Sequence, residues 1–112
     1  MMIPGQETEK MELKGTFVSQ AHPTSGTVSV NKERTVMTFT NFKTDTGPLV
    51  EVWLSTTTTP SNPSTYTSLG MIKGVDGDYT YSIPASVDFS SQKIVNIWCV
   101  DFSVSFGYAE LK

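Results

Sequence analysis

The chain has 112 residues, a net charge of −3 and a pI near 4.9, and its length fits one domain with a single core. Only 17% of its residues are charged, below the roughly 25% of an average globular domain. The eight Lys and Arg residues are scattered along the chain, so the basic surface that nucleic-acid binding requires is absent and nucleic acid is excluded as an expected partner.

The N-terminal residues 1–12 are polar and predict a tail or tether, followed by one folded domain over residues 13–112. This start lacks the basic and apolar regions of a signal peptide, and no stretch reaches the ~18 apolar residues of a membrane span. Two interpretations stay open, a cytosolic protein or an exported protein whose natural leader has been removed.

The rest of the chain is rich in β-branched and aromatic residues and shows no sustained helical spacing of apolar residues. The expected strands, in chain order, are residues 15–20, 26–30, 35–40, 49–55, 66–72, 78–83, 94–100 and 103–111. Eight short strands at such regular spacing predict an all-β fold, an antiparallel β-sandwich.

Turn residues suggest how some of these strands connect. The polar residues 31–34 predict a hairpin between the second and third strands, and the Asp76–Gly77 pair predicts another between residues 66–72 and 78–83. The low-complexity stretch 56–65 is rich in Thr, Ser and Pro and predicts a long surface loop.

Cys99 is the only cysteine, so it has no partner for a disulfide within the chain. Strand alternation places Cys99 on the same face as Val95 and Ile97, which favours an inert core cysteine. Its position close to the end of a strand also allows the sulfur to lie exposed at the rim of the sheet, where a thiol can be oxidised or bind a metal. Both interpretations remain open.

His22 is the only histidine and lies in a predicted turn, where a solvated side chain is the simplest interpretation. The alternative pairs His22 with Cys99, either as a metal ligand or as a proton acceptor for the thiol. One His, one Cys and scattered carboxylates do not make a recognisable zinc set. No metal site is therefore predicted, although copper or haem ligation is left open.

Both tryptophans are expected on the polar side of their strands. Trp53 shares a face with Glu51 and Ser55, and Trp98 shares a face with Asn96. Either a loop covers each indole, or the indoles form an exposed platform for a carbohydrate, a quinone-like ring or a protein. The second possibility predicts a surface binding module.

Several segments occur in an order that resembles a known family. They are residues 15–17, His22–Gly26, Asn41–Phe42, Gly47–Pro48, residues 52–55, residues 70–74, residues 81–84 and the distinctive ending over 95–111. Together they are similar to the DM-thirteen domain, a small all-β extracytoplasmic module, over about residues 13–112.

The resemblance implies a role in electron transfer, with Cys99 as the redox centre and with His22 and Trp98 as motif companions. It also implies export, often as a lipid-tethered protein, and a redox partner that is a protein or a small-molecule electron carrier. We therefore expect an extracytoplasmic redox module rather than a stand-alone enzyme, in which Cys99 is oxidised reversibly to a sulfenic acid or a mixed disulfide. The alternative is a binding module that uses exposed Trp53 and Trp98.

Overall fold

The computed structural model describes residues 11–112, so residues 1–10 of the tail predicted over residues 1–12 lie outside them. The strands are β1 (Leu13–Thr16), β2 (Val18–Ser19), β3 (Ser25–Val30), β4 (Val36–Lys43), β5 (Val50–Ser55), β6 (Tyr66–Met71), β7 (Asp76–Ser82), β8 (Ile94–Cys99) and β9 (Val104–Glu110). The only helical element in this part of the chain is the short 3-10 turn Pro63–Thr65, so none of its helices is long enough to cross a membrane.

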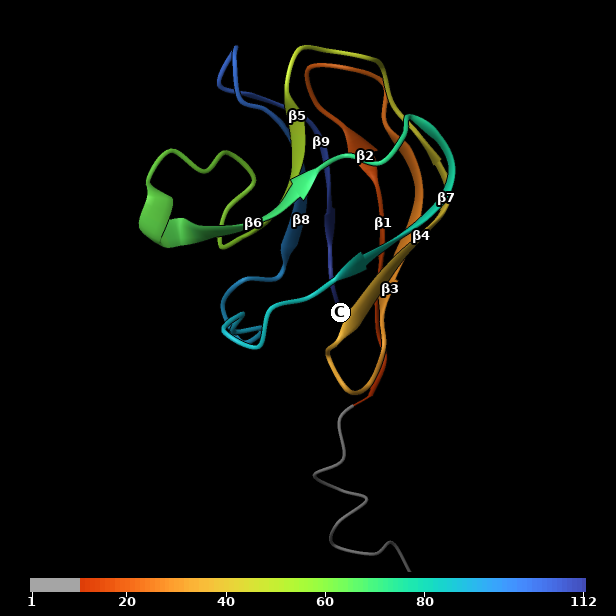
Figure 1. Cartoon of the computed structure of the whole chain (residues 1–112), viewed down its shortest axis with the longest axis vertical. Helices are drawn as coiled ribbons and strands as arrows, with labels where there is room; N and C mark the ends of the chain where they lie inside the picture. The colour runs from red at the N-terminus through yellow and green to blue at the C-terminus, as the bar shows by residue number, and fades with distance from the viewer. Residues whose placement is uncertain (1–10) are drawn as a thin grey trace, which may run out of the picture.

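These strands form two antiparallel sheets that pack face to face as a sandwich (Figure 1). One sheet has the order β1-β3-β4-β7 and the other has the order β2-β9-β8-β5-β6. The predicted all-β sandwich is confirmed. It has nine strands rather than eight because the first predicted strand divides at Phe17: β1 pairs with β3, whereas β2 pairs with β9 in the opposite sheet. Phe17 itself is buried between the sheets.

The two predicted hairpins have different outcomes. β3 and β4 pair as predicted around the turn at residues 31–34. The hairpin predicted at Asp76–Gly77 is wrong, because β6 pairs with β5 in one sheet and β7 pairs with β4 in the other. Asp76 and Gly77 instead begin β7, where Gly77 has a φ of 143° and pairs with Phe42 beside an irregularity in the ladder.

The core is formed by the inward side chains of both sheets, as alternation along each strand predicts. An aromatic cluster fills the side of the four-stranded sheet, with Phe39 at its centre. The ring centroids of Phe17, Phe42 and Tyr81 lie 5.0, 4.8 and 4.9 Å from that of Phe39. The opposing side is largely aliphatic and includes Val52, Leu54, Val95 and Ile97.

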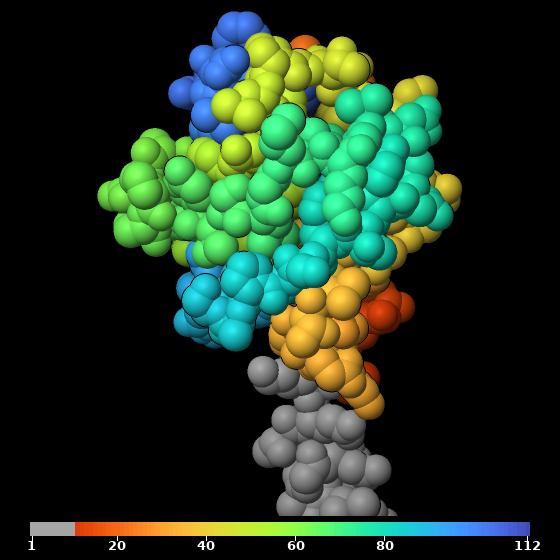
Figure 2. Space-filling model, viewed as in Figure 1, coloured from red at the N-terminus to blue at the C-terminus, as the bar shows by residue number. Residues whose placement is uncertain are grey.

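One end of the sandwich, at the top of Figure 1, gathers three connections: residues 20–24, residues 44–49 between β4 and β5, and residues 100–103 between β8 and β9. Hydrogen bonds join them. The hydroxyls of Thr24 and Thr44 lie 3.0 Å apart, and the Val100 N–H donates to the Leu49 carbonyl at 2.9 Å. The predicted loop 56–65 projects to one side of the molecule, in green in Figure 2.

Candidate functional site: a buried thiol and a covered pair of indoles

Cys99 is the last residue of β8, in the middle of the five-stranded sheet, opposite Val50 of β5 and Val104 of β9. Its side chain points to the inner face with Val95 and Ile97 and has an exposed fraction of 0%. The predicted position at a strand end is confirmed. The alternative prediction, that the sulfur is exposed at the rim of the sheet, is wrong, because residues 44–49 close over the end of the strand.

This 44–49 segment makes the thiol's hydrogen bond. The Cys99 S–H donates to the carbonyl oxygen of Pro48 at 3.2 Å. The segment is fixed at both ends, where the Thr44 N–H donates to Val75 at 2.9 Å and the Leu49 carbonyl accepts from Val100. Its residues from 45 to 49 are exposed on their outer side. One short stretch of surface backbone therefore separates the sulfur from solvent.

Two backbone features mark this segment. A Cβ added at Gly47 would lie 2.7 Å from Cζ of Phe106, so only glycine lets the chain lie this close to that ring. Leu49 has a φ of 51°, a conformation that is uncommon for a branched residue without special reason. Strained residues of this kind gather at sites that change conformation.

His22 lies at the same end of the sandwich but forms no hydrogen bond with Cys99. Its ring packs against Phe106 with the centroids 4.0 Å apart, and its Nδ1 lies 2.8 Å from Oδ2 of Asp45. The two side chains are 40% and 53% exposed, so this contact, a hydrogen bond that becomes an ion pair only when the imidazole is protonated, is worth at most about 1 kcal/mol. The histidine holds the 44–49 segment rather than the sulfur.

The tryptophans lie on the outer face of the five-stranded sheet, as alternation predicts. The exposed platform is wrong, because the exposed fractions of Trp53 and Trp98 are 6% and 7%. Loop 56–65 covers this face, with Pro60 fully buried and the Thr58 carbonyl accepting from Nδ2 of Asn96 at 2.9 Å. The prediction that a loop covers the indoles is therefore confirmed.

Beneath this loop the rings form a stack. Trp53 lies parallel to Tyr66 at 3.6 Å between centroids and packs against Trp98 at 5.0 Å, so both faces of its indole are occupied. The indole N–H of Trp53 donates to Oε1 of Glu51 at 2.8 Å, and that oxygen also accepts from Ser68. Glu51 therefore holds the Trp53 indole in place through a hydrogen bond and is not an isolated surface acid.

Sequence reasoning missed several residues of these two regions. Phe106 lies within the distinctive segment 95–111, but alternation alone could not show that its ring lies between His22 and Gly47. Asp45 and Tyr66 lie in or beside loops, where spacing carries no signal about partners. Asn96 is fully buried, and its Oδ1 has no hydrogen-bond partner in the part of the chain that the structure describes.

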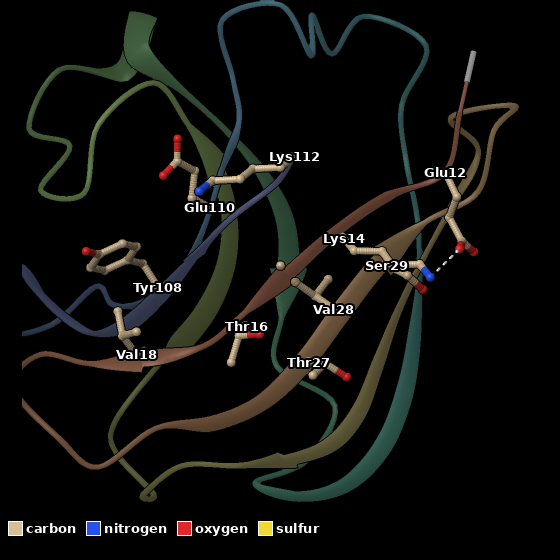
Figure 3. Close-up of a pocket in the computed structure, with 11 residues that line it drawn as sticks. Glu12, Lys14, Thr16, Val18, Thr27, Val28, Ser29, Tyr108, Glu110 and Lys112 are labelled. Atoms are coloured by element: carbon tan, nitrogen blue, oxygen red, sulfur yellow. Dashed lines mark ion pairs between the residues drawn. The ribbon is translucent and has the colours of Figure 1, made fainter. Parts of the chain in front are cut away.

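Residues 11–112 contain no group of three or more His, Cys, Asp or Glu side chains placed to hold a metal ion. These residues therefore provide no set of side chains that would support the copper or haem alternative. A separate hollow of about 810 Å³ lies along β1, β3 and β9, and two glutamates and two lysines are among its lining residues (Figure 3). None of the sequence-predicted site residues lines it.

Comparison with known proteins gives one result. The family model described as "Electron transfer DM13" matches residues 16–111, which is nearly the whole chain. No curated protein and no solved structure matches the sequence. The matched range contains the buried thiol, the 44–49 segment, His22 and both tryptophans. The chain therefore belongs to the electron transfer DM13 family.

Proposed function

We propose that this domain transfers electrons by reversible oxidation of Cys99, and that the 44–49 segment opens to admit the reaction partner. The observation that carries the proposal is the Cys99 S–H bond to the Pro48 carbonyl, because it places the chain's only thiol directly beneath an exposed segment. Membership of an electron transfer family supports the redox role.

The chemistry is a thiol–disulfide exchange with a partner disulfide. Cys99 loses its proton to solvent, and the thiolate attacks one partner sulfur to form a mixed disulfide while the other partner sulfur leaves as a thiolate that takes up a proton. Two electrons pass to the partner. A second thiol, as its thiolate, then attacks the partner sulfur of the mixed disulfide and forms a new disulfide with it, while Cys99 leaves as a thiolate and takes up a proton. In this scheme the domain is a redox module that works with a partner protein or a small-molecule carrier.

The closed conformation does not permit this reaction, because attack on a disulfide needs contact between sulfur atoms. The Cys99 S–H is a weak hydrogen-bond donor, so its bond to the Pro48 carbonyl contributes little free energy to holding the segment over the sulfur. Local opening of a surface segment takes less free energy than global unfolding. The 44–49 segment lies outside the strands, so its movement can leave β8 and its neighbours β5 and β9 in place.

We also propose an extracytoplasmic location, with a lipid tether upstream of the domain, as the resemblance described above implies. A partner disulfide persists in such an oxidising compartment. Attachment to a surface would keep the domain close to its electron donor and acceptor.

The test uses folded protein and an aromatic disulfide whose released thiolate is coloured. We expect one equivalent of thiolate per chain, a mixed disulfide on Cys99 by mass spectrometry, and recovery of the thiol on adding a dithiol. Cys99→Ser supplies the control and should release nothing. Reaction that begins only where circular dichroism shows unfolding would refute the proposal.

A further inference from the structure

A pocket of about 430 Å³ opens on the outer face of the five-stranded sheet, between loop 56–65 and the turn after β8. This volume lies within the range of small-molecule sites, roughly 300–1,000 Å³. Its apolar lining is formed by the aromatic stack, two prolines and one aliphatic residue: Trp53, Tyr66, Trp98, Pro60, Pro63 and Val100. Large rings beside rigid prolines suit a flat, mostly apolar ligand.

The polar part of the lining is small and uncharged. It consists of the hydroxyl residues Thr59, Ser61 and Ser103, and no acidic or basic side chain lines the pocket. A ligand with a formal charge would leave water without gaining a counter-charge there. The lining therefore favours a neutral molecule and disfavours phosphorylated cofactors.

One lining residue, Trp98, carries an unused hydrogen-bond donor. The Trp98 indole N–H makes no hydrogen bond with the residues that the structure describes, although the side chain is only 7% exposed. The indole nitrogen is not completely sealed, so the N–H keeps some contact with solvent. By contrast, the Trp53 N–H is already bonded to Glu51. A buried indole N–H usually finds an acceptor, and a ligand carbonyl would provide one.

We propose that this pocket binds a neutral planar ring bearing a carbonyl oxygen, the chemistry of a quinone, with Trp98 as its hydrogen-bond donor. The suggestion that the ring is an electron carrier rests on the proposed function. Its neutral, flat and carbonyl-bearing chemistry is inferred from the pocket alone. Trp98 and Val100 flank Cys99 in sequence and line the pocket, while the thiol faces the other side of the same strand. A bound ring would thus lie across the sheet from the sulfur.

A carbohydrate fits this pocket less well. Each face of Trp53 is covered by another ring, so no open indole face remains there for a sugar to stack on. A sugar would also bring many hydroxyls against Pro, Val and aromatic walls, where most of them would lose water without a replacement partner. The planar ring with one or two acceptors leaves few polar atoms unsatisfied.

The experiment titrates folded, ¹⁵N-labelled protein with tetramethyl-1,4-benzoquinone, whose ring is fully substituted and so offers no ring position for simple thiol addition. The two indole N–H signals are assigned with Trp53→Phe and Trp98→Phe. We expect saturable movement of the Trp98 signal and a smaller shift of the Trp53 signal. A methyl glycoside at the same concentration should move neither signal.

Variants separate the donor from the pocket. Trp98→Phe keeps a ring but removes the N–H, and affinity should fall about five- to tenfold, as for the loss of one hydrogen bond. Val100→Lys places a charged chain at a half-buried lining position and should weaken binding at least as much. Cys99→Ala, on the opposite face, should bind normally even if the redox role of the thiol proves wrong.

Several results would overturn the inference. One is an unchanged Trp98 signal at the solubility limit of the quinone. Others are binding that survives Val100→Lys, or a glycoside that competes with the quinone. If Trp98→Phe fails to fold, Val100→Lys and the glycoside still decide the question.

Discussion

The two faces of β8 are both buried, but different parts of the molecule bury them. On the inner face, Ile97 and Cys99 pack against the opposite sheet within the main core. On the outer face, Asn96 and Trp98 lie beneath loop 56–65, a stretch rich in Thr, Ser and Pro. A sandwich normally leaves an outer face to solvent. Here one polar loop makes a second, smaller core. The comparison shows that the face of the sheet on which a side chain lies does not by itself determine whether that side chain is exposed.

The largest expected effect compares neighbouring residues on the two faces. Ile97→Ala should lower the free energy of unfolding by about 2–5 kcal/mol, and Trp98→Ala should lower it by about 3–5 kcal/mol, because each leaves a cavity. Urea unfolding followed by circular dichroism measures both. A loss below about 0.5 kcal/mol for Trp98→Ala, typical of a surface site, would show that loop 56–65 does not seal the outer face.

The next effect tests the 44–49 segment at Gly47. Gly47→Ala places a Cβ 2.7 Å from Phe106 and should cost about 1–3 kcal/mol by overpacking. Because the segment must shift, Cys99 should also react at least tenfold faster with a thiol reagent. Thr46→Ala, at the exposed neighbouring position, is the matched control and should change neither quantity. Equal reaction rates in the two variants would show that the 44–49 segment does not control the access of reagents to Cys99.

A smaller effect concerns the hydrogen-bonded contact of Asp45 with His22. Asp45→Asn should lower stability by less than about 1 kcal/mol, since both partners are partly exposed. The same change should speed thiol modification several-fold, because it loosens the segment from outside. Asp101→Asn removes an equal charge from the exposed turn after β8 and serves as the comparison. Identical behaviour of both variants would mean that the change in net charge, not the loss of the Asp45–His22 contact, is responsible.

The smallest effect at neutral pH concerns Tyr81 on the inner face of β7. Burial raises the pKa of Tyr81 above 10.0, the value of a free phenol, despite the hydrogen bond from the Lys73 N–H. As pH rises above 10.0, the phenol loses its proton more readily in the unfolded chain than in the folded one. The free energy of unfolding therefore keeps its full value below that pH and falls above it. Urea unfolding at neutral and at alkaline pH measures the loss. Tyr81→Phe should reduce it, and an unchanged alkaline loss would show that other groups cause it.

Much of the fold was predictable because period-two alternation fixes which face a side chain occupies. Val52 and Leu54 point inward and Trp53 points outward, as expected. Exposure was not predictable in the same way, because it depends on where loop 56–65 lies, and a low-complexity stretch carries no such signal. The hairpin at Asp76–Gly77 failed for a related reason: a turn dipeptide reports local geometry, not the sheet to which the next strand belongs.

The candidate site was predictable only as a set of residue types. The position of Cys99 at the end of β8 followed from the pattern of residues 94–100. Its covering by Gly47 and Pro48 did not, because that contact joins residues 51 positions apart. His22 was expected either in solvent or beside the thiol. It lies instead against Phe106 and Asp45, and only the assembled end of the sandwich shows this.

The most direct measurement is the rate at which Cys99 of the folded protein reacts with a thiol reagent across a range of urea concentrations below the unfolding transition. If the 44–49 segment opens by itself, the rate at low urea should reach a plateau that hardly depends on urea, and Gly47→Ala should raise that plateau. If the rate instead follows global unfolding at every concentration, with the full urea dependence of the transition, the thiol is reached only in the unfolded chain and the account is contradicted.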